Sequence, residues 1–134
     1  MAKLTEIEGI GEFYAEKLRE IGIPTTNSLL EKGSTPAGRK AIAEKAGISG
    51  KLVLEWVNRA DLFRIKGVAE EYADLLEEAG VDTVPELAQR DAGSLHEMMA
   101  AANARKKLVR ALPAPSIVAG WIEQAKKLPR VLKY

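Results

Sequence analysis

The sequence contains no cysteine and only one histidine, His96. Without cysteine, the chain cannot form disulfides, use a catalytic thiolate or bind zinc or iron–sulfur clusters through sulfur. One imidazole cannot build a multi-histidine metal site or a histidine pair for acid–base catalysis. No nucleophilic serine motif is present, and the carboxylates lie on predicted helix surfaces without converging. We therefore expect a protein that is not an enzyme, with no metal, no cofactor and no small-molecule substrate.

The sequence also lacks long apolar runs and strand-like patterns. No stretch of about 18 apolar residues occurs, so we expect no membrane span and no membrane partner. Glu6 and Glu8 precede any apolar run, which predicts that there is no signal peptide and that the protein is cytoplasmic. No segment alternates apolar and polar residues over the length of a strand, so the fold class should be all-α.

An internal repeat organises the chain. The stretch Ile7–Ile23 returns as Ile65–Val81, with Gly9 recurring 58 positions later as Gly67. Further on, Trp56 recurs 65 positions later as Trp121, so the second copy carries about seven extra residues, which we place around residues 112–115. We predict internal repeats over residues 1–61 and 62–134, packed as one pseudo-symmetric domain of 134 residues.

Several residues mark the expected helix ends. Thr35 followed by Pro36 is typical of an N-cap and a first helical position, Ser49 can cap the next helix, and Gly22 and Gly80 can end helices in the left-handed conformation. Three further pairs have capping-box spacing: Thr5 with Glu8, Thr83 with Glu86 and Ser94 with Glu97.

Two pairs of aromatic residues occupy equivalent places in the repeats. Trp56 and Trp121 each lie on an apolar stripe at helical spacing, which predicts that both are core residues. Tyr14 and Tyr72 each precede a small packing alanine. A half-buried core position is the favoured interpretation for the tyrosines, and a stacking surface for bases is the alternative.

Residues 4–23 predict a helix, a Gly-apolar-Gly turn and a second helix that has Ala15 and Leu18 on its inner face. This arrangement resembles the helix-hairpin-helix motif, and residues 62–81 resemble it again. The whole chain resembles a bacterial domain family of unknown function built on two such units, through residues 56–87 and the ending Leu128–Val131. The resemblance implies two hairpin units with additional helices.

The resemblance also implies contact with nucleic-acid phosphates, without sequence specificity, at two turns. The candidate positions are Gly9, Ile10, Gly11, Gly67, Val68 and Ala69. We expect positive φ at Gly9 and Gly11, with helix N-terminal N–H groups facing outward. Ala69 stands where a second glycine is expected. Acidic residues follow both turns where the family usually has lysine or arginine: Glu12, Glu70 and Glu71.

The net charge of +1 hides an uneven distribution. Residues 1–99 contain 12 basic and 18 acidic residues, whereas residues 100–134 contain eight basic residues and one acidic residue. A basic binding patch and a solvated face with cations near helix C-termini both account for this charge. The candidate phosphate-binding cations are Arg105, Lys106, Lys107, Arg110, Lys126, Lys127 and Arg130.

Two functions remain open at this point. The first is a non-catalytic module that contacts nucleic acid through the C-terminal cations rather than the acidic hairpins. The second is a protein–protein adaptor, or a chain that self-associates through its oppositely charged parts. The acidic hairpins favour the second function, and the motif with the basic C-terminal region favours the first.

Overall fold

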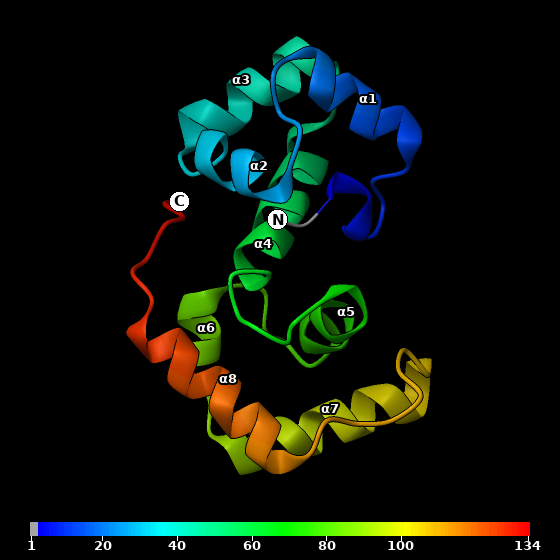
Figure 1. Cartoon of the computed structure of the whole chain (residues 1–134), viewed down its shortest axis with the longest axis vertical. Helices are drawn as coiled ribbons and strands as arrows, with labels where there is room; N and C mark the ends of the chain where they lie inside the picture. Colours follow the sequence, from blue (N-terminus) through cyan, green and yellow to red (C-terminus); the bar gives the residue numbers. More distant parts are fainter. Residues whose placement is uncertain (1–2) are drawn as a thin grey trace. The chain divides into compact units, whose positions relative to one another are not determined.

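Helices make up the regular structure of residues 3–134, the part of the chain that this computed structural model describes, apart from an isolated β-bridge between Lys3 and Thr25 (Figure 1). The all-α class is thereby confirmed. The contacts divide the chain into two units. Unit 1 contains the residues up to Phe63 together with Arg130–Tyr134, and unit 2 contains Arg64–Pro129. Packing of the repeats as one body stays a prediction.

The helices follow the same order in both units. Unit 1 contains the 3-10 helix η1 (Leu4–Glu6), then α1 (Glu12–Glu20), α2 (Thr26–Lys32), α3 (Pro36–Ala46) and α4 (Gly50–Leu62). Unit 2 contains α5 (Glu70–Glu78), α6 (Val84–Ala88), α7 (Ala92–Lys106) and α8 (Pro115–Lys127). The lengths of α1 and α5 agree at 9 residues, and those of α4 and α8 agree at 13.

Four of the expected helix ends are confirmed. The Thr35 side chain accepts from Gly38 N–H at 3.1 Å with Pro36 at the first helical position, and the Ser49 side chain caps α4. Gly22 and Gly80 have φ of +86° and +94° after α1 and α5. These caps satisfy N–H and C=O groups that a helix leaves unpaired at its ends.

None of the three expected capping boxes forms. Thr5 lies inside η1, and Ser94 lies inside α7, whose N-cap Asp91 accepts from Ser94 N–H at 3.0 Å. Thr83 is the N-cap residue of α6, but its hydroxyl donates to the Glu86 carboxylate at 3.1 Å instead of accepting a backbone hydrogen bond. The reciprocal capping box is at Thr25 with Ser28, because serine can accept as glutamate does in that motif.

A glycine under a tryptophan recurs in the core of each unit. A Cβ on Gly9 would lie 3.3 Å from Trp56 Nε1, and a Cβ on Gly67 would lie 3.1 Å from Trp121 Nε1. Both indoles are 2% exposed. The half-buried tyrosine of each unit packs on its tryptophan, with ring centroids 5.1 Å apart in unit 1 and 5.4 Å apart in unit 2. The core interpretation of these four aromatic residues is confirmed.

The two glycines of the first turn have different backbone conformations. Gly9 has φ of +92°, as expected, but Gly11 has φ of −83° and serves as the N-cap of α1. Ala69 occupies the same N-cap place before α5 with φ of −108°. The expectation of positive φ at Gly11 is therefore wrong, and an alanine fits at this place because the backbone there is extended.

Replacing Gly9 with alanine should lower the free energy of unfolding by at least about 1 kcal/mol, because alanine disfavours positive φ and its Cβ would press on Trp56. Gly11→Ala is the matched control, since its φ is negative and a Cβ there meets nothing within 4 Å; it should cost only about 0.5 kcal/mol, the preference of an N-cap for glycine over alanine. Urea unfolding followed by circular dichroism measures both. Equal losses in the two variants would contradict the structure.

Candidate nucleic-acid interface

The middle residue of each glycine turn faces the core. Ile10 and Val68 are 2% and 5% exposed. Their N–H groups donate to the carbonyls of Ile7 and Ile65, each at 3.1 Å. Ile10 and Val68, which the resemblance implied as phosphate contacts, therefore stabilise the turns from the core side, and their N–H groups are already hydrogen-bonded. Phosphate contact at a turn would have to come from the N–H groups that follow it.

Helices α1 and α5 begin without a side-chain cap. Neither Gly11 nor Ala69 provides a capping side-chain hydrogen bond, so the first N–H groups of both helices are available to an anion. However, the first turn of α1 carries Glu12, and that of α5 carries Glu70 and Glu71. These carboxylates complement the positive end of the helix dipole and oppose the approach of a polyanion.

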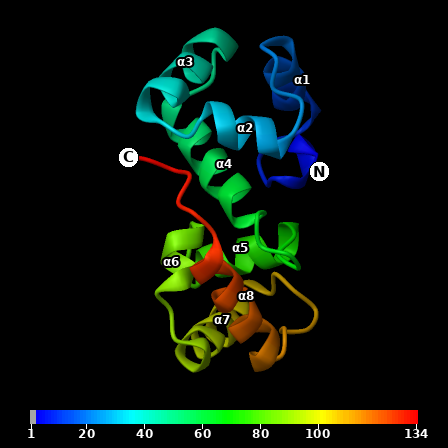
Figure 2. The ribbon, with the colours of Figure 1, turned by 60° about the vertical axis from the view of Figure 1, so that its left-hand side comes forward.

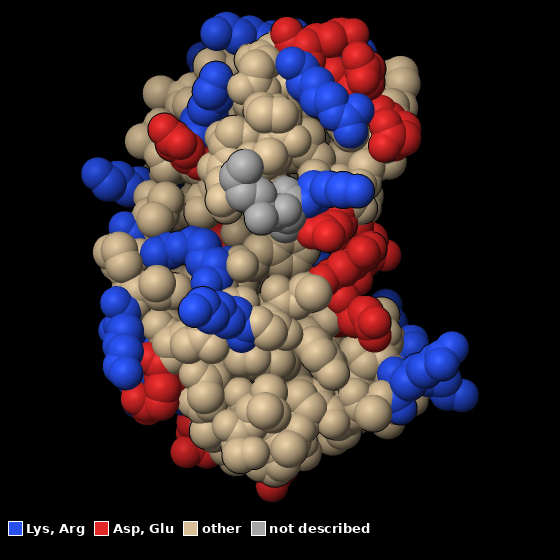
Figure 3. Space-filling view, in the orientation of Figure 1, with Lys and Arg blue, Asp and Glu red and all other residues tan. Residues whose placement is uncertain are grey.

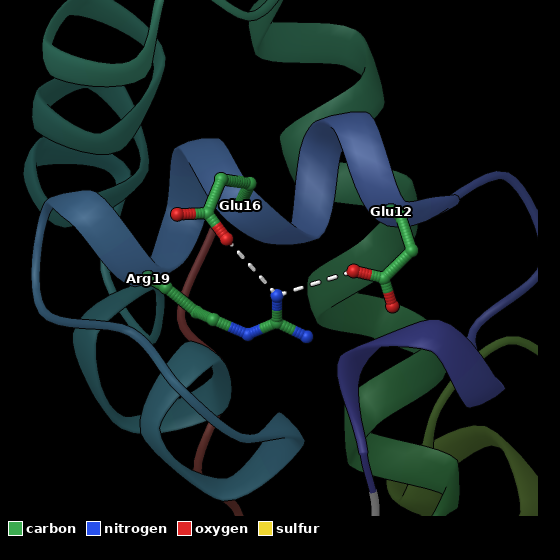
Figure 4. Close-up of polar contacts among 3 residues, drawn as sticks. All are labelled: Glu12, Glu16 and Arg19. Carbon is green, nitrogen blue, oxygen red and sulfur yellow. Dashed lines mark hydrogen bonds and ion pairs between the residues drawn. The ribbon is translucent and has the colours of Figure 1, made fainter.

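The acidic charge of α1 is partly compensated within the helix. Arg19 Nη1 lies 3.3 Å from Glu12 Oε2 and 3.2 Å from Glu16 Oε2, as Figure 4 shows. The hydrogen bond to Glu12 has the largest effect and raises the pKa of Arg19; desolvation opposes it, and the hydrogen bond to Glu16 adds a further, smaller increase. In α5 the residue equivalent to Arg19 is Glu77, and the helix contains five acidic and no basic residues. The second turn is therefore the less favourable of the two for a phosphate.

The cations near residue 107 project from the end of α7. Arg105 and Lys106 lie in its last turn, Lys107 is its C-cap, and Arg110 follows in the loop; all four are exposed. We name them the α7 cluster. Figure 3 shows their basic side chains standing out at the C-terminal end of α7. Within the described part of the chain, the ion pair of the cluster joins Lys106 Nζ to Glu78 Oε1 at 4.0 Å.

The loop that follows the α7 cluster is tied to α7 at both ends. The Asn103 amide donates to Val109 O at 3.1 Å and accepts from Val109 N–H at 3.0 Å. Nearer the start of the helix, His96 Nε2 lies 3.1 Å from Pro113 O. His96 is half-buried, and its ring lies against this loop. Sequence reasoning missed Asn103, whose partner is the backbone of a loop.

The α7 cluster has no counterpart in unit 1. In unit 1, residues 47–49 connect α3 to α4. When α3 and α7 are aligned on their N-caps, Thr35 and Asp91, residues 103–114 of unit 2 stand in the place of this connection. The extra residues of the second copy therefore extend α7 and lengthen the loop, earlier in the chain than the place expected around residue 112. All four cluster residues lie beyond the end of α7 expected from α3.

The remaining candidate cations do not join the α7 cluster. Lys126 and Lys127 lie in the last turn of α8, and Figure 1 shows the C-terminal ends of α7 and α8 on opposite sides of unit 2. Lys126 is 3.4 Å from Glu123. Arg130 belongs to unit 1, where its Nε donates to Leu132 O at 3.2 Å. The Gly67 turn is separated from Lys106 of the cluster by the length of α5. Lys106 pairs with Glu78 at the end of this helix, whereas the turn lies at its start, about 13 Å along the helix.

Lys107 holds a strained conformation that predicts a stability difference. With φ of 51°, it is the one non-glycine residue with positive φ among residues 3–134. The corresponding C-cap in unit 1, at the end of α3, is Gly47, with φ of +67°. Lys107→Gly should raise the free energy of unfolding by about 0.5–1 kcal/mol. Gly47→Lys, in open space, should lower it by about 1 kcal/mol. Chemical unfolding checks both, and a destabilised Lys107→Gly variant would contradict the assignment of strain.

No group of three or more His, Asp or Glu side chains suited to a metal ion occurs over the described residues. Within the same residues, the helices are too short or too polar to cross a membrane. Comparison with curated proteins and with solved structures found no match. A family model described as a domain of unknown function (DUF4332) matches residues 8–128, and the chain therefore belongs to the DUF4332 family.

Proposed function

We propose that this chain is a non-catalytic binding module of two helix-hairpin-helix units that contacts nucleic acid through phosphates, without sequence specificity. The α7 cluster carries the proposal. Four exposed cations fall within six residues on an insertion that the other repeat lacks. Such a group of cations can release counterions from a phosphate backbone, which drives non-specific binding.

The helix dipole accounts for only part of the α7 cluster. Cations in the last turn of a helix are favoured by its negative end, which explains Arg105 and Lys106. Arg110 lies beyond the helix, and Lys107 occupies a position where glycine would be free of strain. A cation kept at a cost in stability supports a binding role, as does the tether that holds the loop to Asn103.

The contact would read phosphates and not bases. In unit 2 the described aromatic side chains are the half-buried Tyr72 and the buried Trp121, so none is exposed for stacking on bases. The outward N–H groups at the start of α1 offer a second phosphate contact, beside the carboxylates that Arg19 partly compensates. The start of α5, with its five acidic residues, would not take part.

A protein–protein adaptor is the second candidate. Helix α5 presents acidic residues with no basic residue in the helix. On α1, Phe13 is 69% exposed, with Lys17 Nζ lying 5.0 Å from its ring centroid. A large exposed aromatic side chain and a single-signed helix are features of surfaces that bind proteins.

Titration of labelled duplex DNA at rising salt tests the proposed function. The wild-type chain should bind at about 50 mM salt and lose affinity linearly on a log–log plot. The double variant Lys107→Gln/Arg110→Gln should reduce the slope by about 2, because each of the two cations neutralises roughly one phosphate. The matched control Lys126→Gln/Lys127→Gln has the same net charge and should bind almost as the wild type does.

Two results would overturn the proposed function or its location. No binding at about 50 mM salt rejects nucleic acid as the partner. Equally weakened binding in the two double variants rejects the α7 cluster as the binding surface, because only general charge would then matter. A protein retained on immobilised wild-type chain, and no longer retained with Phe13→Ala, would favour the adaptor.

A further inference from the structure

The segment Arg130–Tyr134, here called the tail, packs on unit 1 in an extended conformation. It leaves α8 after Pro129 and reaches the turn between α2 and α3 (Figure 2). Lys133 N–H donates to Ser34 O at 2.8 Å. Leu132 is 1% exposed and joins the hydrophobic core of unit 1. The tail is therefore anchored by its backbone and by one buried side chain.

Arg39 is the main polar partner of the tail. Its guanidinium donates to Gly33 O and to Lys133 O, each at 2.9 Å, and lies 5.5 Å from the centroid of the Tyr134 ring. The Tyr134 hydroxyl donates to Asn58 Oδ1 at 2.8 Å. Arg39 is 8% exposed and forms no ion pair with a carboxylate in the described part of the chain. Backbone carbonyls and an aromatic ring therefore satisfy its charge.

The second repeat has no arginine at the position equivalent to Arg39. When α3 and α7 are aligned on their N-caps, Arg39 corresponds to Leu95, which is fully buried. Burying a guanidinium where leucine would fit is unfavourable unless its donors are bonded. Lys133 O and the Tyr134 ring supply part of that bonding. Unit 1 thus has a surface, formed by Gly33, Ser34, Arg39 and Asn58, that binds this segment, and we call it the Arg39 surface.

We propose that the tail exchanges between copies of this chain, so that the tail of one copy docks on the Arg39 surface of a second copy. The tail is covalently continuous with α8, a helix of unit 2, whereas its hydrogen bonds to Ser34, Arg39 and Asn58 are all with unit 1. A tail from a second copy makes the same hydrogen bonds, so exchange costs none of them. This inference does not rest on the nucleic-acid proposal.

In the wild-type chain, docking of the chain's own tail competes with exchange. Docking within one chain acts as an effective concentration in the millimolar range, so exchange between wild-type copies needs a high protein concentration. Exchange occurs at lower concentration when one copy has a disabled tail and another has a disabled Arg39 surface. The chain offers a substitution for each: Leu132→Asp disables the tail, and Arg39→Leu introduces the residue that unit 2 has at the equivalent place.

The experiment mixes the two full-length variants and measures association by sedimentation velocity. Each variant alone should be monomeric, since the first lacks a docking tail and the second lacks the Arg39 surface. Their mixture should form a 1:1 complex, with association on the order of 100-fold stronger than that of the wild-type chain with itself. Adding Arg39→Leu to the Leu132→Asp chain should abolish the complex, which is the matched control.

Circular dichroism first establishes that each variant is folded. If Leu132→Asp is not, Leu132→Ala takes its place, because it removes the buried anchor of the tail without placing a charge in the core of unit 1. A mixture of folded variants that stays monomeric at millimolar concentration overturns the proposal. So does a complex that persists in the control, because its interface would then lie outside the Arg39 surface.

Discussion

The close approach of a glycine to the edge of an indole ring sets the geometry of both units. A side chain at Gly9 or Gly67 would meet Trp56 or Trp121 at a distance shorter than ordinary van der Waals contact. The turn must pass over the indole with positive φ, which fixes the direction in which α1 or α5 begins. The tyrosine one turn into each helix then packs on the same ring.

On this shared frame, the two units have diverged at different places. Unit 2 carries a longer α7 and a longer loop, which bring the α7 cluster to the surface and hold it through Asn103. Unit 1 carries a buried arginine on α3 where unit 2 has leucine, and that arginine holds the tail. The long loop of unit 2 stands where unit 1 has a short connection, and Arg39 of unit 1 stands where unit 2 has Leu95.

The distribution of charged residues distinguishes these surfaces, whereas the net charge of the chain does not. The carboxylates of α1 are partly paired with Arg19, whereas α5 has no cation of its own. The two turns therefore offer an anion unequal surroundings, although their sequences align closely. The cations of the C-terminal region likewise divide among three places: the end of α7, the end of α8 and the tail.

Local residue patterns were enough to predict the all-α class, the paired aromatic core residues and the helix ends at Thr35, Ser49, Gly22 and Gly80. These features depend on short spacings and on short-range backbone chemistry, which a sequence displays directly. The exposed cations were also located from residue types, although they were grouped as one patch. Three-dimensional packing was needed to show that Ile10 and Val68 face inward, that Asn103 holds a distant loop, and that Arg39 is buried against the tail. Those outcomes depend on backbone carbonyls and side chains brought together from distant parts of the chain, a partnership that residue types alone do not specify.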